Sequence, residues 1–211
     1  MNNTLKQLSS LRIIPVVIIN NENASEQLAQ SLINGGLPCM EVTFRTNEAV
    51  NVIKRVKKAF PSMLLGAGTV ITIDQVKIAK DAGAEFIVSP GLNPKVVEYC
   101  LKENIVITPG VVTPSEVEQA IELGLNVVKF FPAEACGGTA YLKAISAPYK
   151  NMKFIPTGGI NQWNLKSYLE LPYVLACGGS WMVDQSLIAK GNFQESEERT
   201  RSAFALLDSK Q

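Results

Sequence analysis

Residues Leu64–Gly83 read LLGAGTVITIDQVKIAKDAG and contain one complete strand–loop–helix pattern. Leu64–Thr69 is a short apolar run, typical of a strand that is buried on both faces in a parallel sheet. Thr72 and Gln75 have the spacing of a capping box, which marks the start of a helix. Gly83 follows the amphipathic stretch and suits the left-handed backbone conformation that ends many helices. The segment therefore predicts one βα unit.

The same pattern recurs along the whole chain. Eight apolar runs are strand candidates: Ile13–Ile19, Cys39–Phe44, Leu64–Thr69, Phe86–Ser89, Val106–Thr108, Val127–Phe131, Phe154–Thr157 and Leu175–Cys177. Further helix boundaries are indicated by capping-box or cap-then-proline spacing and by glycines: starts at Asn23–Glu26, Asn93-Pro94 and Thr113–Glu116, ends at Gly35-Gly36 and Gly124. Strands and helices that alternate through short loops form right-handed βα units, and eight of them close a barrel.

The predicted fold class is therefore α/β, a (β/α)8 TIM barrel that forms a single domain over residues 1–211. We expect Met1–Leu11 to form a helix across the bottom of the barrel and Phe193–Leu207 to form the last outer helix. The alternative is an open doubly wound sheet, which usually has a glycine-rich phosphate loop after its first strand. Here that position reads Ile19-Asn-Asn-Glu-Asn23. Polar residues and glycines instead follow many strands, and a barrel gathers such residues at one end.

The charge balance argues against several classes of partner. The chain has 20 Lys plus Arg and 19 Asp plus Glu, a formal net charge of +1, so no basic excess favours nucleic acid or an anionic membrane. The N-terminal apolar run is short and broken by Pro15, unlike a signal peptide, and no run has the length of a membrane span. We therefore expect a cytoplasmic protein with reduced, structural cysteines.

The sequence contains no histidine. This composition excludes Ser-His-Asp and Cys-His catalysis and makes a catalytic zinc site improbable, so no metal and no cofactor are predicted. Acid–base chemistry then falls to carboxylates, lysine, tyrosine or water. Among ways to activate a carbonyl compound, an imine on lysine needs no histidine, whereas a metal-stabilised enolate normally uses histidine ligands.

Lys129 lies within the apolar run Val127-Val-Lys-Phe-Phe131. A lysine in a buried strand is costly as a cation, and both burial and a nearby Arg45 favour its neutral, nucleophilic form. Such an environment suits an imine-forming lysine. The alternative is a structural lysine that snorkels or pairs with a carboxylate, and the local sequence weighs the two about equally.

Glu41 and Arg45 belong to the second predicted strand. Because strand side chains alternate, Cys39, Glu41 and Thr43 share one face, and an inward face would bring Glu41 to Lys129. A desolvated glutamate can both accept and donate a proton, although a structural ion pair with Lys129 is the other interpretation. Arg45 suits a substrate carboxylate, and taken alone it also fits a solvated loop cation.

Two glycine pairs follow the last two predicted strands, in Thr157-Gly-Gly159 and Gly178-Gly-Ser180. Barrels commonly bind phosphate at these loops, where glycines allow close approach of backbone N–H groups. Each pair alone indicates only a turn. Together they predict a site for a phosphorylated ligand.

Several motifs resemble those of the bacterial 2-keto-3-deoxy-6-phosphogluconate (KDPG) aldolases, a family that also acts on 4-hydroxy-2-oxoglutarate (KHG). They are Glu41-Val-Thr-Phe-Arg-Thr46, Gly66-Ala-Gly-Thr-Val70, Ser89-Pro-Gly91, Lys129-Phe-Phe-Pro-Ala-Glu134, Pro156-Thr-Gly-Gly-Ile160 and Gly178-Gly-Ser-Trp181. The resemblance extends from about Ile13 to Phe204, and its departures, Phe44 and Cys136, fall outside the proposed roles. Galactonate-type relatives are also similar, but they carry asparagine at the position of Arg45.

The resemblance implies a homotrimeric class I aldolase of the Entner–Doudoroff pathway that cleaves KDPG to pyruvate and glyceraldehyde 3-phosphate. The implied site residues, grouped by role, are Lys129 as Schiff-base lysine and Glu41 as acid–base group; Arg45 and Thr69 at the substrate carboxylate; Pro90 and Phe131 as pocket walls; and Thr157, Gly158, Gly159, Gly179 and Ser180 at the hydroxyl and phosphate end.

Three rival functions stay open from the residues. One is a galactonate-type aldolase. Another is a cofactor-free phosphosugar isomerase or epimerase, which would use Glu41 as base and Lys129 only electrostatically. A third is a catalytically silent sensor of a phosphorylated ligand. Borohydride trapping with pyruvate separates the imine-forming enzymes from the other two.

Overall fold

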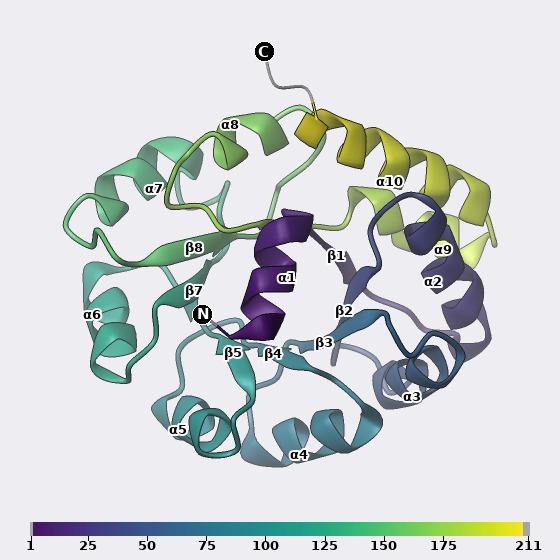
Figure 1. The fold of residues 1–211 in the computed structure, drawn as a ribbon, viewed down its shortest axis with the longest axis horizontal. Coiled ribbons are helices and arrows are strands. Elements are labelled where there is room, and N and C mark those ends of the chain that lie inside the picture. The colour runs from purple at the N-terminus through teal and green to yellow at the C-terminus, as the bar shows by residue number, and fades with distance from the viewer. Residues whose placement is uncertain (1, 209–211) are drawn as a thin grey trace.

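Two parallel sheets form the centre of the computed structural model, which describes residues 2–208 (Figure 1). One has six strands in the order β5–β4–β3–β2–β1–β9, and the other has three in the order β6–β7–β8. The strands are β1 Ile13–Val17, β2 Cys39–Thr43, β3 Leu64–Gly68, β4 Phe86–Val88, β5 Val106–Thr108, β6 Gly110–Val111, β7 Val127–Phe130, β8 Lys153–Pro156 and β9 Cys177–Gly179. Every ladder pairing is parallel.

The two sheets approach each other at both of their edges. Isolated parallel bridges join Phe154 to Val174 and Thr157 to Gly178, between the segments of β8 and β9. At the other edge, β5 and β6 are consecutive and are separated only by Pro109, which has no N–H to donate to a ladder. The Pro109 carbonyl still accepts a 2.9 Å hydrogen bond from the N–H of Lys129. The predicted α/β class with parallel strands is thus confirmed; the strand expected at Val106–Thr108 is β5, and β6, which follows Pro109, was not predicted.

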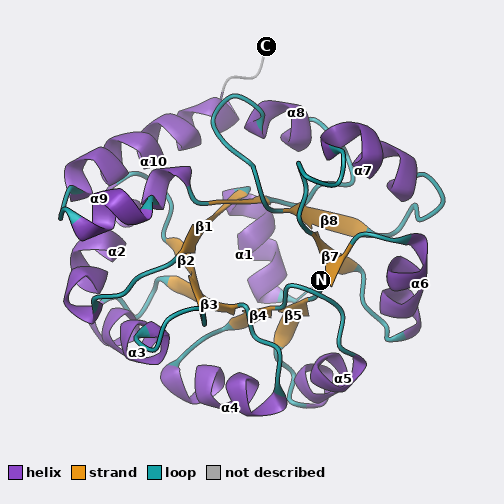
Figure 2. Ribbon diagram, turned by 180° about the vertical axis from the view of Figure 1, so that it is seen from behind, coloured by secondary structure: helices purple, strands orange, loops and turns teal. Residues whose placement is uncertain are grey.

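Helices cover the strands: all but α1 lie around the outside, and α1 lies across one end (Figures 1 and 2). They are α1 Asn3–Leu11, α2 Ser25–Asn34, α3 Ala49–Ala59, α4 Ile73–Ala82, α5 Pro94–Lys102, α6 Pro114–Glu122, α7 Gly138–Ser146, α8 Leu165–Leu169, α9 Gln185–Ala189 and α10 Phe193–Asp208, with short 3-10 helices η1 Glu22–Ala24 and η2 Trp181–Val183. The capping boxes predicted at Thr72 and Thr113 are present, and Asn93 caps α5 with Pro94 in its first turn.

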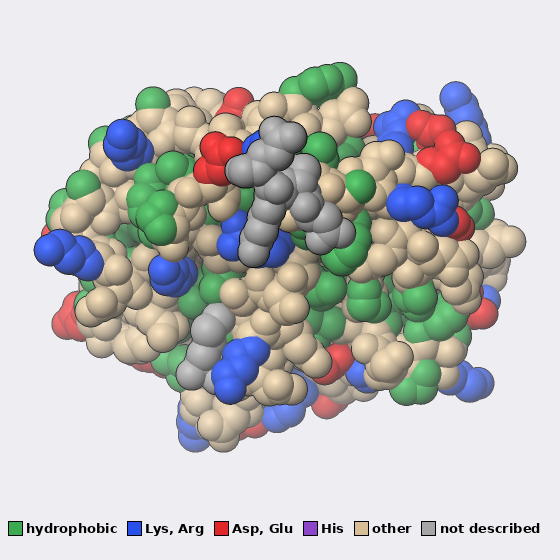
Figure 3. All heavy atoms as spheres, turned by 45° about the horizontal axis from the view of Figure 1, so that its top comes forward, with side chains coloured by type: hydrophobic (Ala, Val, Ile, Leu, Met, Phe, Trp, Pro, Cys, Tyr) green, Lys and Arg blue, Asp and Glu red, His purple; other side chains and the backbone are tan. Residues whose placement is uncertain are grey.

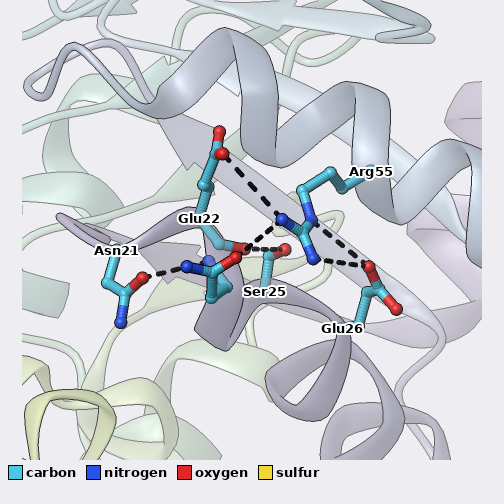
Figure 4. Close-up of polar contacts among 6 residues, drawn as sticks. Asn21, Glu22, Ser25, Glu26 and Arg55 are labelled. Carbon is cyan, nitrogen blue, oxygen red and sulfur yellow. Dashed lines mark hydrogen bonds and ion pairs between the residues drawn. The ribbon is translucent and has the colours of Figure 1, made fainter.

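The helix start predicted at Asn23 is wrong. Asn21 instead accepts a hydrogen bond from the N–H of Asn23 and caps η1, and α2 begins at Ser25 without a side-chain cap. The sequence offers two asparagines as N-caps, Asn21 and Asn23. The structure uses Asn21, which caps the 3-10 helix that precedes α2. Arg55 of α3 contacts the same segment, reaching Glu22, Asn23 and Glu26 (Figure 4). This contact ties the loop after β1 to the neighbouring helix.

Alternating strand residues separate two apolar layers. The outer layer lies between strands and helices and includes Met40 and Val42, whereas Cys39 belongs to the inner layer enclosed by the strands. Leu8 of α1 packs into this inner layer and is only 1% exposed. Helix α1 lies across the N-terminal ends of the strands, behind them in Figure 2. The opposite end, where the strands finish, therefore holds the polar residues singled out above.

The surface carries charges of both signs. Figure 3 shows lysines, arginines and carboxylates scattered among neutral atoms on the displayed face. Among residues 2–208, no helix combines the length and apolar character needed to span a bilayer.

Candidate active site

The side chains of Lys129 and Glu41 meet in the space that the strands surround. Lys129 extends from β7 and Glu41 from β2, and the distance from Lys129 Nζ to Glu41 Oε1 is 3.9 Å. Their side chains are 6% and 4% exposed. The neighbours Val127 and Cys39, two residues earlier on each strand, lie in the inner apolar layer. The prediction from strand alternation that these two side chains meet is therefore confirmed.

Two opposing effects act on the pKa of the Glu41 carboxyl group. Burial raises its pKa above the ordinary value, and the positive charges of Lys129 and Arg45 act in the lowering direction without cancelling the effect. A carboxyl group of this kind exchanges a proton more readily near neutral pH than an exposed glutamate does. The arrangement suits acid–base work beside an amine.

Gly68 of β3 makes space for that carboxylate. A Cβ placed on Gly68 would lie 2.1 Å from Glu41 Oε1. Any side chain at this position would therefore displace the carboxyl group. Position 68 of the Gly66-Ala-Gly68 motif is thus restricted to glycine because a larger residue would collide with Glu41.

Phe131 lies close to Lys129, and Pro90 lies against Gly110, which pairs with Lys129. The Phe131 ring centroid is 4.8 Å from Lys129 Nζ, and the Phe131–Pro132 peptide bond is cis. Gly110 pairs with Lys129 across the β6–β7 ladder, and a Cβ placed on Gly110 would lie 2.1 Å from the Pro90 carbonyl oxygen. Of the two predicted wall residues, Phe131 thus contacts the lysine side chain, and Pro90 contacts the neighbouring strand β6.

Arg45 and Thr69 contact each other where their strands end. Arg45 Nε donates a 3.3 Å hydrogen bond to Thr69 Oγ1, and the Arg45 side chain is exposed. Thr69 has φ +59, the left-handed region that residues with a Cβ rarely adopt. An exposed guanidinium beside a hydroxyl suits a carboxylate ligand.

The two glycine pairs also lie at this end. Gly158 and Gly159 both have positive φ, +100 and +82. Thr157 packs against Gly178, since a Cβ on that glycine would lie 2.4 Å from Thr157 Oγ1. Ser180 is exposed and precedes η2. The structure thus brings Thr157 to the second glycine pair. It also brings Phe131 to the first pair, since a Cβ placed on Gly158 would lie 3.3 Å from the Phe131 ring.

Sequence reasoning missed two residues next to this turn, Glu134 and Tyr168. The Tyr168 hydroxyl donates a short hydrogen bond to Glu134 Oε1. Glu134 belongs to a motif quoted above, but only as part of its pattern. Tyr168 carries no local signal, because its partner lies 34 positions earlier in the chain.

A buried amine beside a raised-pKa carboxyl group can attack a carbonyl carbon and transfer the protons that the attack requires. Within residues 2–208 no group of three or more histidine, cysteine or acidic side chains is arranged to hold a metal ion. By class, the fold and this pair fit an enzyme that acts on carbonyl compounds.

Comparisons with known proteins identify this class more closely. The family model described as KDPG and KHG aldolase matches residues 4–198. A 2-dehydro-3-deoxy-phosphogluconate aldolase of Treponema pallidum is 50% identical over 188 residues, which cover 89% of this chain and 90% of the relative. The enzyme of the same name from Haemophilus influenzae is 42% identical, with 96% of each chain covered.

A solved structure is similar throughout. The KDPG aldolase of Legionella pneumophila, with pyruvate captured as a covalent carbinolamine intermediate, superposes with a TM-score of 0.92 at 38% identity and covers 96% of this chain and 98% of its own. The protein is therefore an aldolase, a carbon–carbon lyase. It belongs to the KDPG and KHG aldolase family.

Proposed function

We propose that this protein is a class I aldolase that cleaves KDPG to pyruvate and glyceraldehyde 3-phosphate and also acts on 4-hydroxy-2-oxoglutarate. The observation that carries the proposal is the buried Lys129–Glu41 pair, 3.9 Å apart at the end where the strands finish. The family assignment supports the same reaction. Because the pair needs no metal and no organic cofactor for imine chemistry, none is proposed.

The proposed reaction begins on the lysine. The neutral amine of Lys129 attacks the C2 carbonyl carbon, and Glu41 transfers protons so that the carbinolamine loses water and becomes an iminium ion. Glu41 then removes the proton of the C4 hydroxyl group. The C3–C4 bond breaks, the aldehyde leaves, and the bonding electrons pass into the iminium to give an enamine. Protonation at C3 and addition of water release pyruvate and restore Lys129.

The surrounding residues bind the substrate. We assign Arg45 and Thr69 to the pyruvyl carboxylate, because an exposed guanidinium and a hydroxyl group already contact each other there. Pro90 and Phe131 line the pyruvyl part, in keeping with their places beside the strand of Lys129. The distal hydroxyl and phosphate would be bound by Thr157, Gly158, Gly159, Gly179 and Ser180. Left-handed glycines present backbone N–H groups in the manner of anion-binding nests.

We further propose that the two sheets close into one eight-stranded (β/α)8 barrel and that residues 1–211 form one domain capped at the bottom by α1. The bridges between the segments of β8 and β9, and the single residue between β5 and β6, support this closure. A homotrimer and a role in the Entner–Doudoroff pathway follow from the family resemblance, and the cytoplasmic location expected from the sequence completes the proposal.

Borohydride trapping tests the proposed chemistry. The protein is incubated with pyruvate and sodium borohydride, and digestion with mass spectrometry then locates any reduced pyruvyl adduct. We expect one adduct per chain, on the peptide containing Lys129, and none in Lys129→Ala, which should also lose KDPG cleavage. Cleavage of KDPG without any pyruvyl adduct would show that the reaction does not pass through an imine on Lys129, and the proposed mechanism would be wrong.

A further inference from the structure

The segment after β7 runs directly beside the first glycine turn. The N–H of Ala133 donates to the Thr157 carbonyl at 2.9 Å, and the N–H of Glu134 donates to the Gly158 carbonyl at 3.0 Å. The chain that leaves the Lys129 strand is therefore hydrogen-bonded to the turn that forms part of the predicted phosphate end. A shift of one segment requires a shift of the other.

The side chain of Glu134 covers Gly159. A Cβ placed on Gly159 would lie 2.6 Å from both Cβ and Cγ of Glu134, so the methylene groups of the glutamate occupy the space above this glycine. With φ +82, Gly159 has a backbone conformation that glycine adopts readily and residues with a Cβ adopt rarely. Because glycine has several such conformations open to it, the contact with Glu134 restricts the turn from one side.

Tyr168 fixes the other end of the Glu134 side chain. Its hydroxyl group donates to Glu134 Oε1, and its side chain is fully buried in α8. Burial, and then the bond to Glu134, raise the pKa of the tyrosine, so the phenol stays protonated and can donate at all working pH values. The Cα of Gly138 packs against the same pair, since an added Cβ would lie 3.0 Å from Glu134 Oε1 and 3.4 Å from the Tyr168 oxygen. Gly138 thus contacts both members of the pair, of which Tyr168 is buried and Glu134 is exposed.

The carbonyl group of Gly159 is held as well. The Nδ2 atoms of Asn161 and Asn164 donate to it at 3.2 and 3.0 Å. Asn164 Oδ1 also accepts from the N–H of Asn161 at 2.8 Å, which ties the loop to itself. With its carbonyl fixed by the asparagines and its Cα covered by Glu134, Gly159 keeps one orientation.

We propose that Glu134 and Tyr168 are positioning residues that hold the Gly158–Gly159 turn at a fixed place relative to Lys129 and so set the preference for a phosphorylated substrate. The inference rests on the proposed function, which assigns the phosphate to this turn. Neither residue has to touch the reacting atoms. Their effect is on where the distal end of the substrate is bound.

Substrates that differ in the phosphate group test the proposal. KDPG carries the phosphate and 4-hydroxy-2-oxoglutarate does not, so the ratio of their kcat/KM values measures the contribution of the distal end. Tyr168→Phe removes one hydroxyl group at nearly constant volume. We expect kcat/KM for KDPG to fall about tenfold, equivalent to about 1.4 kcal/mol, while that for 4-hydroxy-2-oxoglutarate stays within about twofold.

Glu134 provides a second and a third variant. Glu134→Ala removes the methylene cover and the acceptor from an exposed residue, so folding is less affected and the same selective loss is expected. Glu134→Gln keeps the methylene groups and an acceptor oxygen for Tyr168, so it should retain the wild-type ratio. Thermal unfolding of each variant identifies any general loss of folded protein.

Tyr149→Phe is the matched control. Tyr149 OH also donates to a glutamate, Glu118 Oε1 at 3.0 Å, away from the site, so its loss should leave the substrate ratio unchanged. Equal losses on both substrates in Tyr168→Phe and Glu134→Ala, or no loss on either, would overturn the proposed positioning role. In that case the wild-type protein would still cleave KDPG. A wild-type protein that fails to cleave KDPG would instead overturn the proposed function itself.

Discussion

Glu41 illustrates how one residue is placed by its neighbours and used by its chemistry. Strand alternation turns it inward, Gly68 leaves room for its carboxylate, and Lys129 lies 3.9 Å away. Burial raises its pKa more than the two nearby cations lower it. A carboxyl group in this environment suits proton exchange, the role proposed for it above.

Glu41→Gln separates proton transfer by Glu41 from imine formation by Lys129. The amide cannot shuttle protons, so turnover of KDPG should fall about 10²- to 10⁴-fold, the usual contribution of a positioned acid–base group. Lys129 remains, so slow borohydride trapping with pyruvate should persist. Steady-state kinetics and mass spectrometry measure the two effects. A variant with wild-type turnover would show that Glu41 only pairs with the lysine.

The same substitution should affect stability in a pH-dependent way. Because the pKa of Glu41 is raised in the folded protein, the folded state holds more protons than the unfolded state over the interval between the two pKa values. The contribution of this group to the free energy of unfolding therefore falls as pH rises through that interval and stays low at neutral pH.

Glu41→Gln removes the buried charge, so the variant should be more stable than the wild type at about pH 8, with a difference that shrinks towards about pH 4. Urea unfolding at both pH values provides the measurement. The exposed Glu122→Gln is the control and should show little difference at either pH. A variant less stable than the wild type at the higher pH would contradict the expected balance of burial against pairing.

At the scale of one element, β3 places two glycines with different tasks on the same face. An added Cβ on Gly66 would lie 2.2 Å from the ring of Phe86, in the apolar interior, whereas one on Gly68 would lie 2.1 Å from Glu41 Oε1. We expect Gly66→Ala to lower the melting temperature strongly. Gly68→Ala should mainly lower kcat, because it displaces the carboxylate. Parallel melting and kinetic measurements compare them, and identical profiles would refute this division.

Elements with a local pattern could be predicted from the sequence. The strand of Lys129 was expected at Val127–Phe131 and is found at Val127–Phe130, and the caps at Thr72 and Thr113 are present. Elements set by competing or distant partners could not. Two nearby asparagines obscured the start of α2, and the last strand, expected at Leu175–Cys177, is Cys177–Gly179 because its register is set by pairing with β1.

The same distinction applies to the site. Strand alternation and the position of each strand end were enough to predict that Glu41 would meet Lys129. Glu134 and Tyr168 had no such pattern, since their contact depends on how the loop after β7 and helix α8 pack together. Contacts between separate loops require the folded chain, because no periodicity in the sequence encodes them.

For the whole molecule, α1 closes the end of the strands remote from Lys129. Leu8→Ala removes a side chain that is 1% exposed and packs in the inner apolar layer, so the free energy of unfolding should fall by about 2–5 kcal/mol. KM values should not change, since the site is at the other end. The control Leu101→Ala removes a leucine that is 41% exposed and should cost much less. Denaturant unfolding with kinetics would reveal any unexpected coupling between the two ends.

The proposed assembly is also a whole-molecule property. Sedimentation equilibrium should give a mass three times the 22.9 kDa of one chain. Dilution over a wide concentration range shows whether the trimer persists at the concentrations used for kinetics. A mass equal to one chain at every concentration would remove the trimer from the proposal.

Both tryptophans of the sequence lie beside the glycine pairs. Trp163, with 83% of its surface exposed, is in the loop that continues from Gly159, and the Trp181 ring packs against Gly179. The tryptophan fluorescence of this protein therefore comes entirely from the neighbourhood of the two glycine pairs, the proposed place of the distal end of the substrate. A phosphorylated ligand should shift the emission spectrum while pyruvate alone leaves it nearly unchanged, so the native chain carries its own optical reporter and needs no attached dye.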